Sequence, residues 1–228
     1  MKTKIKHLII VLIIFPLIYI GISLTPLAQD LFVKGNNENY VLFWSLIIIV
    51  HWLTFYLVYR FLRNGKQSLK DIGYNLNRKQ TSILIASYLT LGLLVFGFTE
   101  LSLNYVEIDS EKLAKLPNFF PKTTIHRLFF ILSVFTAGFC EEVIYRGFAI
   151  TKLKELGLNK WIALIPSGIS FVFIHGIIGF SQFWMYFIPA ILFGLIYILS
   201  KRLLPGILIH LLYNLTAMMA IFQAINNN

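Results

Sequence analysis

Residues 125–150 read IHRLFFILSVFTAGFCEEVIYRGFAI, an apolar run that contains two adjacent acids, Glu141 and Glu142, and a basic residue, Arg146. The run is long enough to cross a membrane as a helix, because about 20 mostly apolar residues span the hydrocarbon core. An ionisable side chain at membrane depth is costly, so it marks a candidate functional site. The stretch therefore predicts both a transmembrane helix and a site on it.

The whole chain has the composition of an integral membrane protein. Hydrophobic residues make up 57% of its 228 residues and charged residues only 13%, with a mean hydropathy of +0.75. A soluble domain carries about 25% charged residues. We predict an all-α fold, a polytopic membrane bundle of about seven transmembrane helices in a single domain that covers residues 1–228. The expected spans are 7–25, 40–61, 82–100, 125–150, 160–178, 183–200 and 204–223.

The net charge of +10 follows the positive-inside pattern of such a protein. On this map, 15 of the 20 Lys and Arg residues fall at the N-terminus, in the second, fourth and sixth loops, or near the span ends that border these loops. The N-terminus is therefore expected in the cytoplasm, and the basic charge needs no nucleic-acid partner. We expect the first apolar segment to be an uncleaved span rather than a signal peptide. One cysteine, Cys140, excludes an internal disulfide.

The two acids of the central run have different expected roles. Glu142 and Arg146 are four residues apart, share a helix face, and are predicted to form an ion pair. Glu141 then points elsewhere and has no local cation. A carboxylate in that position is suited to act as a general base or acid.

Two further spans bring polar groups to membrane depth. His175 follows Phe171 by one helical turn, and Asn214 follows His210 by one turn. Each histidine alone could be a hydrogen-bonded core residue, but three helices that each contribute such a group favour a shared polar pocket. His51, by contrast, is interpreted as a core or interface histidine. The polar, basic loop at 62–81 is interpreted as solvated, with a basic amphipathic stretch on the lipid headgroups as the alternative.

Other kinds of catalytic site fit the sequence less well. There is no His-Glu-x-x-His zinc helix and no complete nucleophile elbow around Ser170. Cys140 beside two carboxylates is a poor nucleophile, because its thiolate is disfavoured. Two histidines and a glutamate could bind zinc, so a divalent metal stays possible, but no metal is the favoured interpretation.

Three motifs in this order resemble one known family. Glu-Glu-x-x-x-Arg at 141–146, Phe-x-x-x-His at 171–175 and His-x-x-x-Asn at 210–214 are similar to the motifs of the CAAX protease and bacteriocin-processing family. This family of intramembrane glutamic endopeptidases includes the Ras-converting CAAX endopeptidase and lysostaphin-resistance-like proteins. The motifs cover about 75 of the 228 residues, and the first 120 residues show no match.

The resemblance implies catalytic helices at 125–223 and a role for each motif residue. Glu141 and His175 would hold and activate a water, with Glu141 as the general base. His210 and Asn214 would donate hydrogen bonds to the oxyanion of the tetrahedral intermediate. Structural support would come from Glu142, Arg146 and Phe171. Such oxyanion donors are worth on the order of 3 kcal/mol each.

The expected activity is hydrolysis of a peptide bond in a membrane-associated peptide or protein, by a multi-pass protein of the cell membrane. The Ile-, Lys-, Asn- and Phe-rich composition is typical of a bacterial protein, for which prenylated CAAX ends are not expected substrates. One alternative is a non-catalytic membrane regulator or bacteriocin self-immunity protein that acts by binding a membrane partner. Another is a proton-coupled carrier, which the absence of an inverted repeat in the sequence disfavours. The oligomeric state stays open.

Overall fold

The structure is a computed structural model of the chain. The structure describes residues 2–32, 37–83, 85–86, 90, 93, 97 and 121–226, with side chains described as far as Leu215. Every regular element among these residues is helical, so the predicted all-α class is confirmed. The predicted span 82–100 lies largely outside the described residues.

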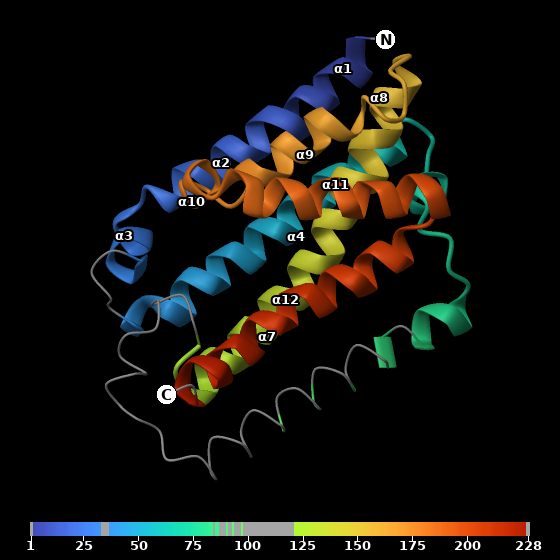
Figure 1. Cartoon of the computed structure of the whole chain (residues 1–228). Coiled ribbons are helices and arrows are strands. Elements are labelled where there is room, and N and C mark those ends of the chain that lie inside the picture. Colours follow the sequence, from blue (N-terminus) through green and yellow to red (C-terminus); the bar gives the residue numbers. More distant parts are fainter. Residues whose placement is uncertain are drawn as a thin grey trace.

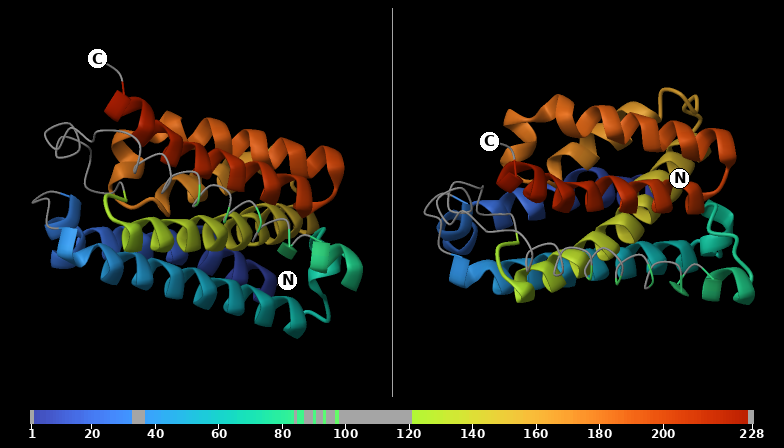
Figure 2. Two further views of the ribbon diagram at one scale, coloured as in Figure 1. Left: turned by 90° about the horizontal axis from the view of Figure 1, so that it is seen from below. Right: turned by 60° about the horizontal axis from the view of Figure 1, so that its bottom comes forward.

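The helices form a bundle of long, roughly aligned rods (Figures 1 and 2). In chain order they are α1 (Lys2–Ile9), η1 (Ile10–Ile14), α2 (Phe15–Ser23), α3 (Pro26–Phe32), η2 (Asn37–Asn39), α4 (Tyr40–Asn64), η3 (Leu69–Ile72), α7 (Thr124–Glu141), η4 (Glu142–Ile150), α8 (Thr151–Glu155), α9 (Leu164–Phe173), α10 (Ile178–Ser181), α11 (Phe183–Ser200) and α12 (Leu203–Asn226). The start of α1 and the end of α12 lie at opposite ends of the bundle (Figure 1).

The central rod is the continuous helix α7–η4–α8, which covers Thr124–Glu155. In its most apolar stretch, 67% of the residues are buried by protein, against 17–28% in the other helices long enough to cross a membrane. The rod packs against α4, α9, α11 and α12. Its η4 segment is π-helical over nine residues, a rare geometry that often occurs at functional sites. The quoted run 125–150 therefore forms the interior of the bundle.

The predicted count of seven spans is not confirmed. Within the described residues, four helices are long and apolar enough to cross a membrane: Ile5–Ser23, Tyr40–Asn64, Thr124–Glu155 and Phe183–Ser200. The predicted span 204–223 corresponds to α12, which is apolar over Leu203–Leu215. The predicted span 160–178 is instead the ten-residue helix α9, about 15 Å long, followed by a turn and the short α10.

A backbone reversal at Gly176 ends the segment that contains α9. Gly176 has φ +68°, which a residue with a side chain rarely adopts. A Cβ there would lie 2.5 Å from Cβ of Ser23, and the Ile177 amide donates to Ser23 Oγ at 3.1 Å. The turn is thus fixed against the end of α2, so His175 lies in a turn and not within a helix.

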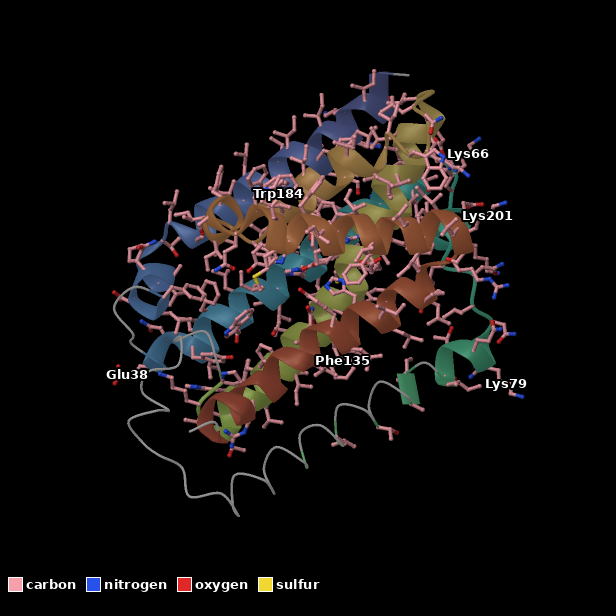
Figure 3. The ribbon with its side chains drawn as sticks, in the orientation of Figure 1. Glu38, Lys66, Lys79, Phe135, Trp184 and Lys201 are labelled. Atoms are coloured by element: carbon pink, nitrogen blue, oxygen red, sulfur yellow. The ribbon has the colours of Figure 1, made fainter. Side chains whose placement is uncertain are left out.

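The outer surface of the bundle is apolar, and its two ends differ in charge. Large exposed side chains such as Leu53, Leu132 and Leu199 cover the long helices, as expected for a surface that faces lipid. Figure 3 shows the labelled Lys66, Lys79 and Lys201 at one end and Glu38 at the other. This separation agrees with the charge pattern of the sequence, and the cytoplasmic N-terminus stays a prediction.

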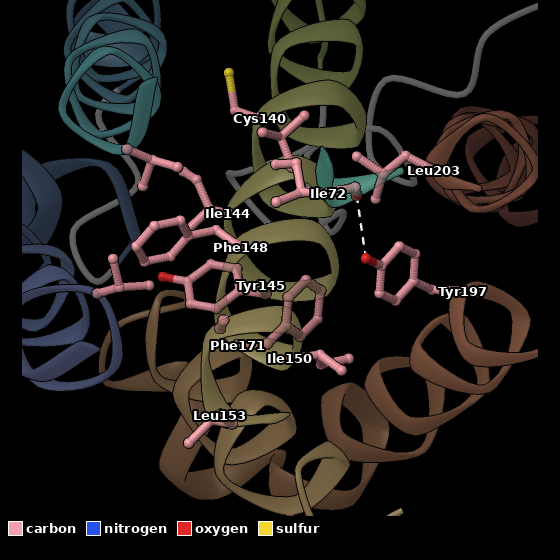
Figure 4. Close-up of a cluster of buried hydrophobic side chains, with 14 of the residues drawn as sticks. Ile72, Cys140, Ile144, Tyr145, Phe148, Ile150, Leu153, Phe171, Tyr197 and Leu203 are labelled. Atoms are coloured by element: carbon pink, nitrogen blue, oxygen red, sulfur yellow. Dashed lines mark hydrogen bonds between the residues drawn. The ribbon is translucent and has the colours of Figure 1, made fainter. Parts of the chain in front are cut away.

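The loop after α4 is docked on the bundle, so its interpretation as a solvated loop is wrong for Ile72. Ile72 is fully buried in the large apolar cluster around η4 (Figure 4). Tyr197 donates its hydroxyl hydrogen bond to the Ile72 carbonyl at 3.1 Å, and the Leu203 amide donates to the Gly73 carbonyl at 3.0 Å. The few apolar residues of this polar loop form no periodic run of helix or strand length, which is why sequence patterns missed the burial of Ile72.

Candidate active site

The site is built around Glu141 and Glu142, at the junction of α7 and η4 in the middle of the central rod. Both carboxyl side chains are buried, with Glu141 5% and Glu142 0% exposed. Neighbouring residues on a helix point in different directions. The two carboxylates accordingly enter two different polar groups, and His210 of α12 contacts both.

Glu142 belongs to a buried ion network with Arg146 and His210. Arg146 Nη1 lies 3.3 Å from Glu142 Oε1, the pair that the four-residue spacing predicts. His210 Nδ1 lies 3.1 Å from the same oxygen. Arg146 also donates to the Ala190 carbonyl at 3.4 Å, and its guanidinium lies 4.1 Å from the ring centre of Phe171. These contacts give Glu142, Arg146 and Phe171 a structural part in the site.

Glu141 is not the unpaired carboxylate that the sequence suggested. Its Oε1 lies 2.9 Å from Nε2 of His51 on α4. Its Oε2 lies 3.7 Å from His210 Nε2, too far for a direct hydrogen bond. Oε2 is buried and has no hydrogen-bond partner among the described residues. One oxygen of Glu141 is thus occupied and the other is open.

His175 is held through one ring nitrogen, and the other makes no hydrogen bond to the residues that the structure describes. Its Nδ1 lies 3.0 Å from the Phe171 carbonyl oxygen, which can only accept, so Nδ1 carries the hydrogen. In the neutral ring, Nε2 then has the lone pair. The ring stacks on Tyr186 of α11 at 3.9 Å between centroids. Nε2 of His175 is therefore able to accept a hydrogen bond.

Asn214 lies one turn beyond His210 on α12, as the spacing predicts, and is half-buried. Its side chain makes no hydrogen bond within the described part of the chain, so its amide group is available to a ligand. The structure brings Glu141, Glu142 and His210 together, with Arg146 on Glu142 and Phe171 beside the Arg146 guanidinium and the His210 ring. His175 lies next to this group, with 5.2 Å between its ring centroid and that of Phe171. Asn214 shares only α12 with this group, through His210.

His51 is the residue of this site that sequence reasoning missed. The interpretation of His51 as a core histidine agrees with its burial, but it does not include the contact with Glu141, the shortest that Glu141 makes with any described side chain. The signal was present: an ionisable residue inside the apolar run 40–61 meets the same criterion that selected His175. What the sequence could not show is that residues 90 positions apart would meet.

The basic side chains around the two glutamates lie against carboxylate oxygens. Among the residues that the structure describes, no three His, Cys, Asp or Glu side chains come together in a group that could hold a metal. His51 and His210 each direct a ring nitrogen at a carboxylate, and Arg146 faces Glu142 as well.

The site thus combines two buried glutamates with histidines from separate helices, in a chain with helices long and apolar enough to cross a membrane. Residues 123–216 match the family model described as type II CAAX prenyl endopeptidase Rce1-like. This match places an Rce1-like domain at residues 123–216, and the family is one of CAAX-type proteases, which supports a protease of this kind. No curated protein and no solved structure matches the chain. The match contains Glu141, His175, His210 and Asn214, but it leaves out α4 and His51.

Proposed function

We propose that this protein is an endopeptidase that hydrolyses a peptide bond of a membrane-associated peptide or protein, with Glu141 as the general base. The observation that carries the proposal is the open oxygen of Glu141, Oε2, which is buried 3.7 Å from Nε2 of His210 and has no hydrogen-bond partner among the described residues. A water at this oxygen would find an acceptor for its proton in Oε2 and a second acceptor in His175 Nε2. Both interactions would orient it for attack.

The reaction can be written with the side chains present. Oε2 takes a proton from water while the water oxygen attacks the carbonyl carbon, and the substrate carbonyl becomes an oxyanion. Hydrogen-bond donors for that oxyanion would be the Asn214 amide and, in its protonated form, the His210 ring. When the C–N bond breaks, the proton on Glu141 passes to the leaving amine. Base, proton and leaving group then balance without a further reactant.

We propose that the substrate is reached from the membrane, because the outer surface of the bundle is apolar and the site lies inside it. The cell membrane is the proposed location. Peptide precursors, signalling peptides and membrane proteins are the proposed substrate classes. No metal is required in this scheme, since each catalytic step uses an oxygen or nitrogen of the side chains named above.

The test is incubation of the purified protein in lipid with candidate membrane peptides, followed by mass spectrometry of the fragments. Glu141→Gln keeps the volume but removes the base, and cleavage should fall by about 10²–10⁴-fold. Asn214→Leu should lower kcat by about 10²-fold. Glu155→Gln is the matched control, because it removes an exposed carboxylate at the end of α8 and should cleave normally.

The opposite outcome identifies the competing function. If wild type and Glu141→Gln cut peptides equally, the chemistry does not depend on this base. If no cleavage occurs and the cellular phenotype survives Glu141→Gln, the bundle acts as a binding partner and not as a protease.

A further inference from the structure

His51, which lies outside the residues that match the protease family, is in direct contact with the proposed general base. Its side chain is 5% exposed on α4, and α4 packs against α7 along the bundle. Its Nε2 lies 2.9 Å from Glu141 Oε1, and its Nδ1 lies 2.9 Å from the Ile47 carbonyl oxygen. The edge of the Tyr19 ring contacts it from α2, with 5.1 Å between ring centroids.

These two contacts fix the number of protons on the pair. The Ile47 carbonyl can only accept, so Nδ1 of His51 is protonated. A hydrogen bond between Nε2 and a carboxyl oxygen then requires one more proton, on either the ring or the acid. The pair therefore holds one proton beyond a neutral imidazole and a carboxylate. If Glu141 is to take a proton from water, it must rest as the carboxylate, which places the extra proton on His51.

We propose that His51 is a positioning residue that remains an imidazolium and keeps Oε1 of Glu141 occupied, so that Oε2 is the oxygen that faces the reacting water. The proposal rests on the proposed function of Glu141 and extends it to a residue on α4. Through the reaction, only Oε2 gains and loses a proton, and the proton on Nε2 of His51 is not consumed. A charge-assisted hydrogen bond of this kind also holds the carboxylate in one rotamer.

The burial of Glu141 makes such a partner necessary. An ionised carboxylate without a partner is expensive to keep inside a protein, and more so within a membrane. Arg146 lies on Glu142, and His210 Nδ1 is directed at Glu142 as well. Among the described side chains, His51 alone makes a hydrogen bond to Glu141.

The activity test uses two substitutions of His51 in the full chain reconstituted in lipid. His51→Leu removes the donor, and because misplacing a reacting group by about 1 Å costs on the order of 10²-fold, kcat should fall about 100-fold with KM nearly unchanged. His51→Gln retains an N–H that can reach Oε1 and should recover a large part of that loss. His126→Gln is the matched control, since His126 is also a buried histidine, at the start of α7, where it stacks on Tyr40. This variant should keep the wild-type kcat.

A second measurement needs no activity, so it separates this inference from the proposed function. Nitrogen NMR of histidine-labelled protein, with His51 identified by its loss in His51→Gln, should show both ring nitrogens protonated in wild type. In Glu141→Gln, where the partner has no acidic proton, Nε2 should become unprotonated. If the wild-type protein shows these spectra but cuts no peptide, the proposed protease function is wrong and the proposed pairing of His51 with Glu141 still stands.

Two results would overturn the inference itself. One is an unprotonated Nε2 of His51 in the wild-type protein. The other is a His51→Leu variant that folds, cleaves peptide and keeps the wild-type kcat.

Discussion

Removal of the Arg146 guanidinium is expected to destabilise the protein strongly, because the buried carboxylate of Glu142 then loses its cationic partner. Glu142 is fully buried and Arg146 is 1% exposed. Their 3.3 Å separation corresponds to an attraction of about 5 kcal/mol at an effective dielectric constant of about 20. Breaking a buried pair by deleting one partner costs about 3–5 kcal/mol. Arg146→Met should therefore lower the free energy of unfolding by that amount.

The double variant Glu142→Gln with Arg146→Met tests the cause of this loss. With no charge left to bury, its destabilisation should fall short of the sum of the two single variants by about 1–3 kcal/mol. Part of the loss will remain, because the contact of the guanidinium with the Phe171 ring is also gone. Unfolding in mixed micelles, titrated with a denaturing detergent, measures all three free energies.

The exposed Arg63 at the end of α4 provides the control, since Arg63→Met should change stability by no more than about 0.5 kcal/mol. An Arg146→Met variant as stable as Arg63→Met would refute the reasoning. Strict additivity of the two single variants would do so equally, because it would mean that the acid and the guanidinium do not interact.

Three further predictions concern α12, the docked loop and metal dependence. Gly206→Ala places a Cβ 2.8 Å from Glu142 Oε2 and should cost about 1–3 kcal/mol in the same unfolding assay, whereas Gly21→Ala, with nothing within 4 Å of the new Cβ, should not destabilise. The Ser68 amide and hydroxyl donate to the Asp71 carboxylate at 2.7 and 2.8 Å, and these hydrogen bonds lower the pKa of Asp71 below its ordinary value of 3.8. They therefore stabilise η3 above pH 3.8, and this stabilisation is lost as the pH falls through the lowered pKa. In the wild-type protein, the backbone amides of residues 69–74 should therefore lose protection from hydrogen exchange in acid. In Asp71→Asn the same amides should be unprotected already at neutral pH, with no further loss in acid. Chelator should leave peptide cleavage unchanged, because the proposed steps use only side-chain atoms, and restoration of lost activity by added zinc would contradict this.

The interior of the fold could be predicted from the sequence because its signals are local. The apolar run 125–150 identified the central helix, and the four-residue spacing identified the ion pair of Glu142 and Arg146. The cost of an ionisable group in an apolar span directed attention to Glu141, His175 and His210. Each of these inferences needs only residues within one or two turns of one another.

What sequence patterns missed depends on contacts between distant segments. His51 meets Glu141 only because α4 packs along α7. His175 lies in a turn because Gly176 reverses the backbone against Ser23, and neither residue alone predicts that meeting. Ile72 is buried because its loop is held by hydrogen bonds from the Tyr197 hydroxyl and from the Leu203 amide at the start of α12. Helix periodicity carries no information about such pairings.

The contact between His51 and Glu141 has a consequence for how small a working unit can be. A fragment trimmed to the family-matching portion would lack α4, and Oε1 would lose its donor while Oε2 stayed open. Such a truncated chain would retain every motif residue, but its Glu141 carboxylate would lack the hydrogen bond with His51. On the proposed role of His51, the working unit extends beyond the recognisable motifs and includes α4, which begins at Tyr40.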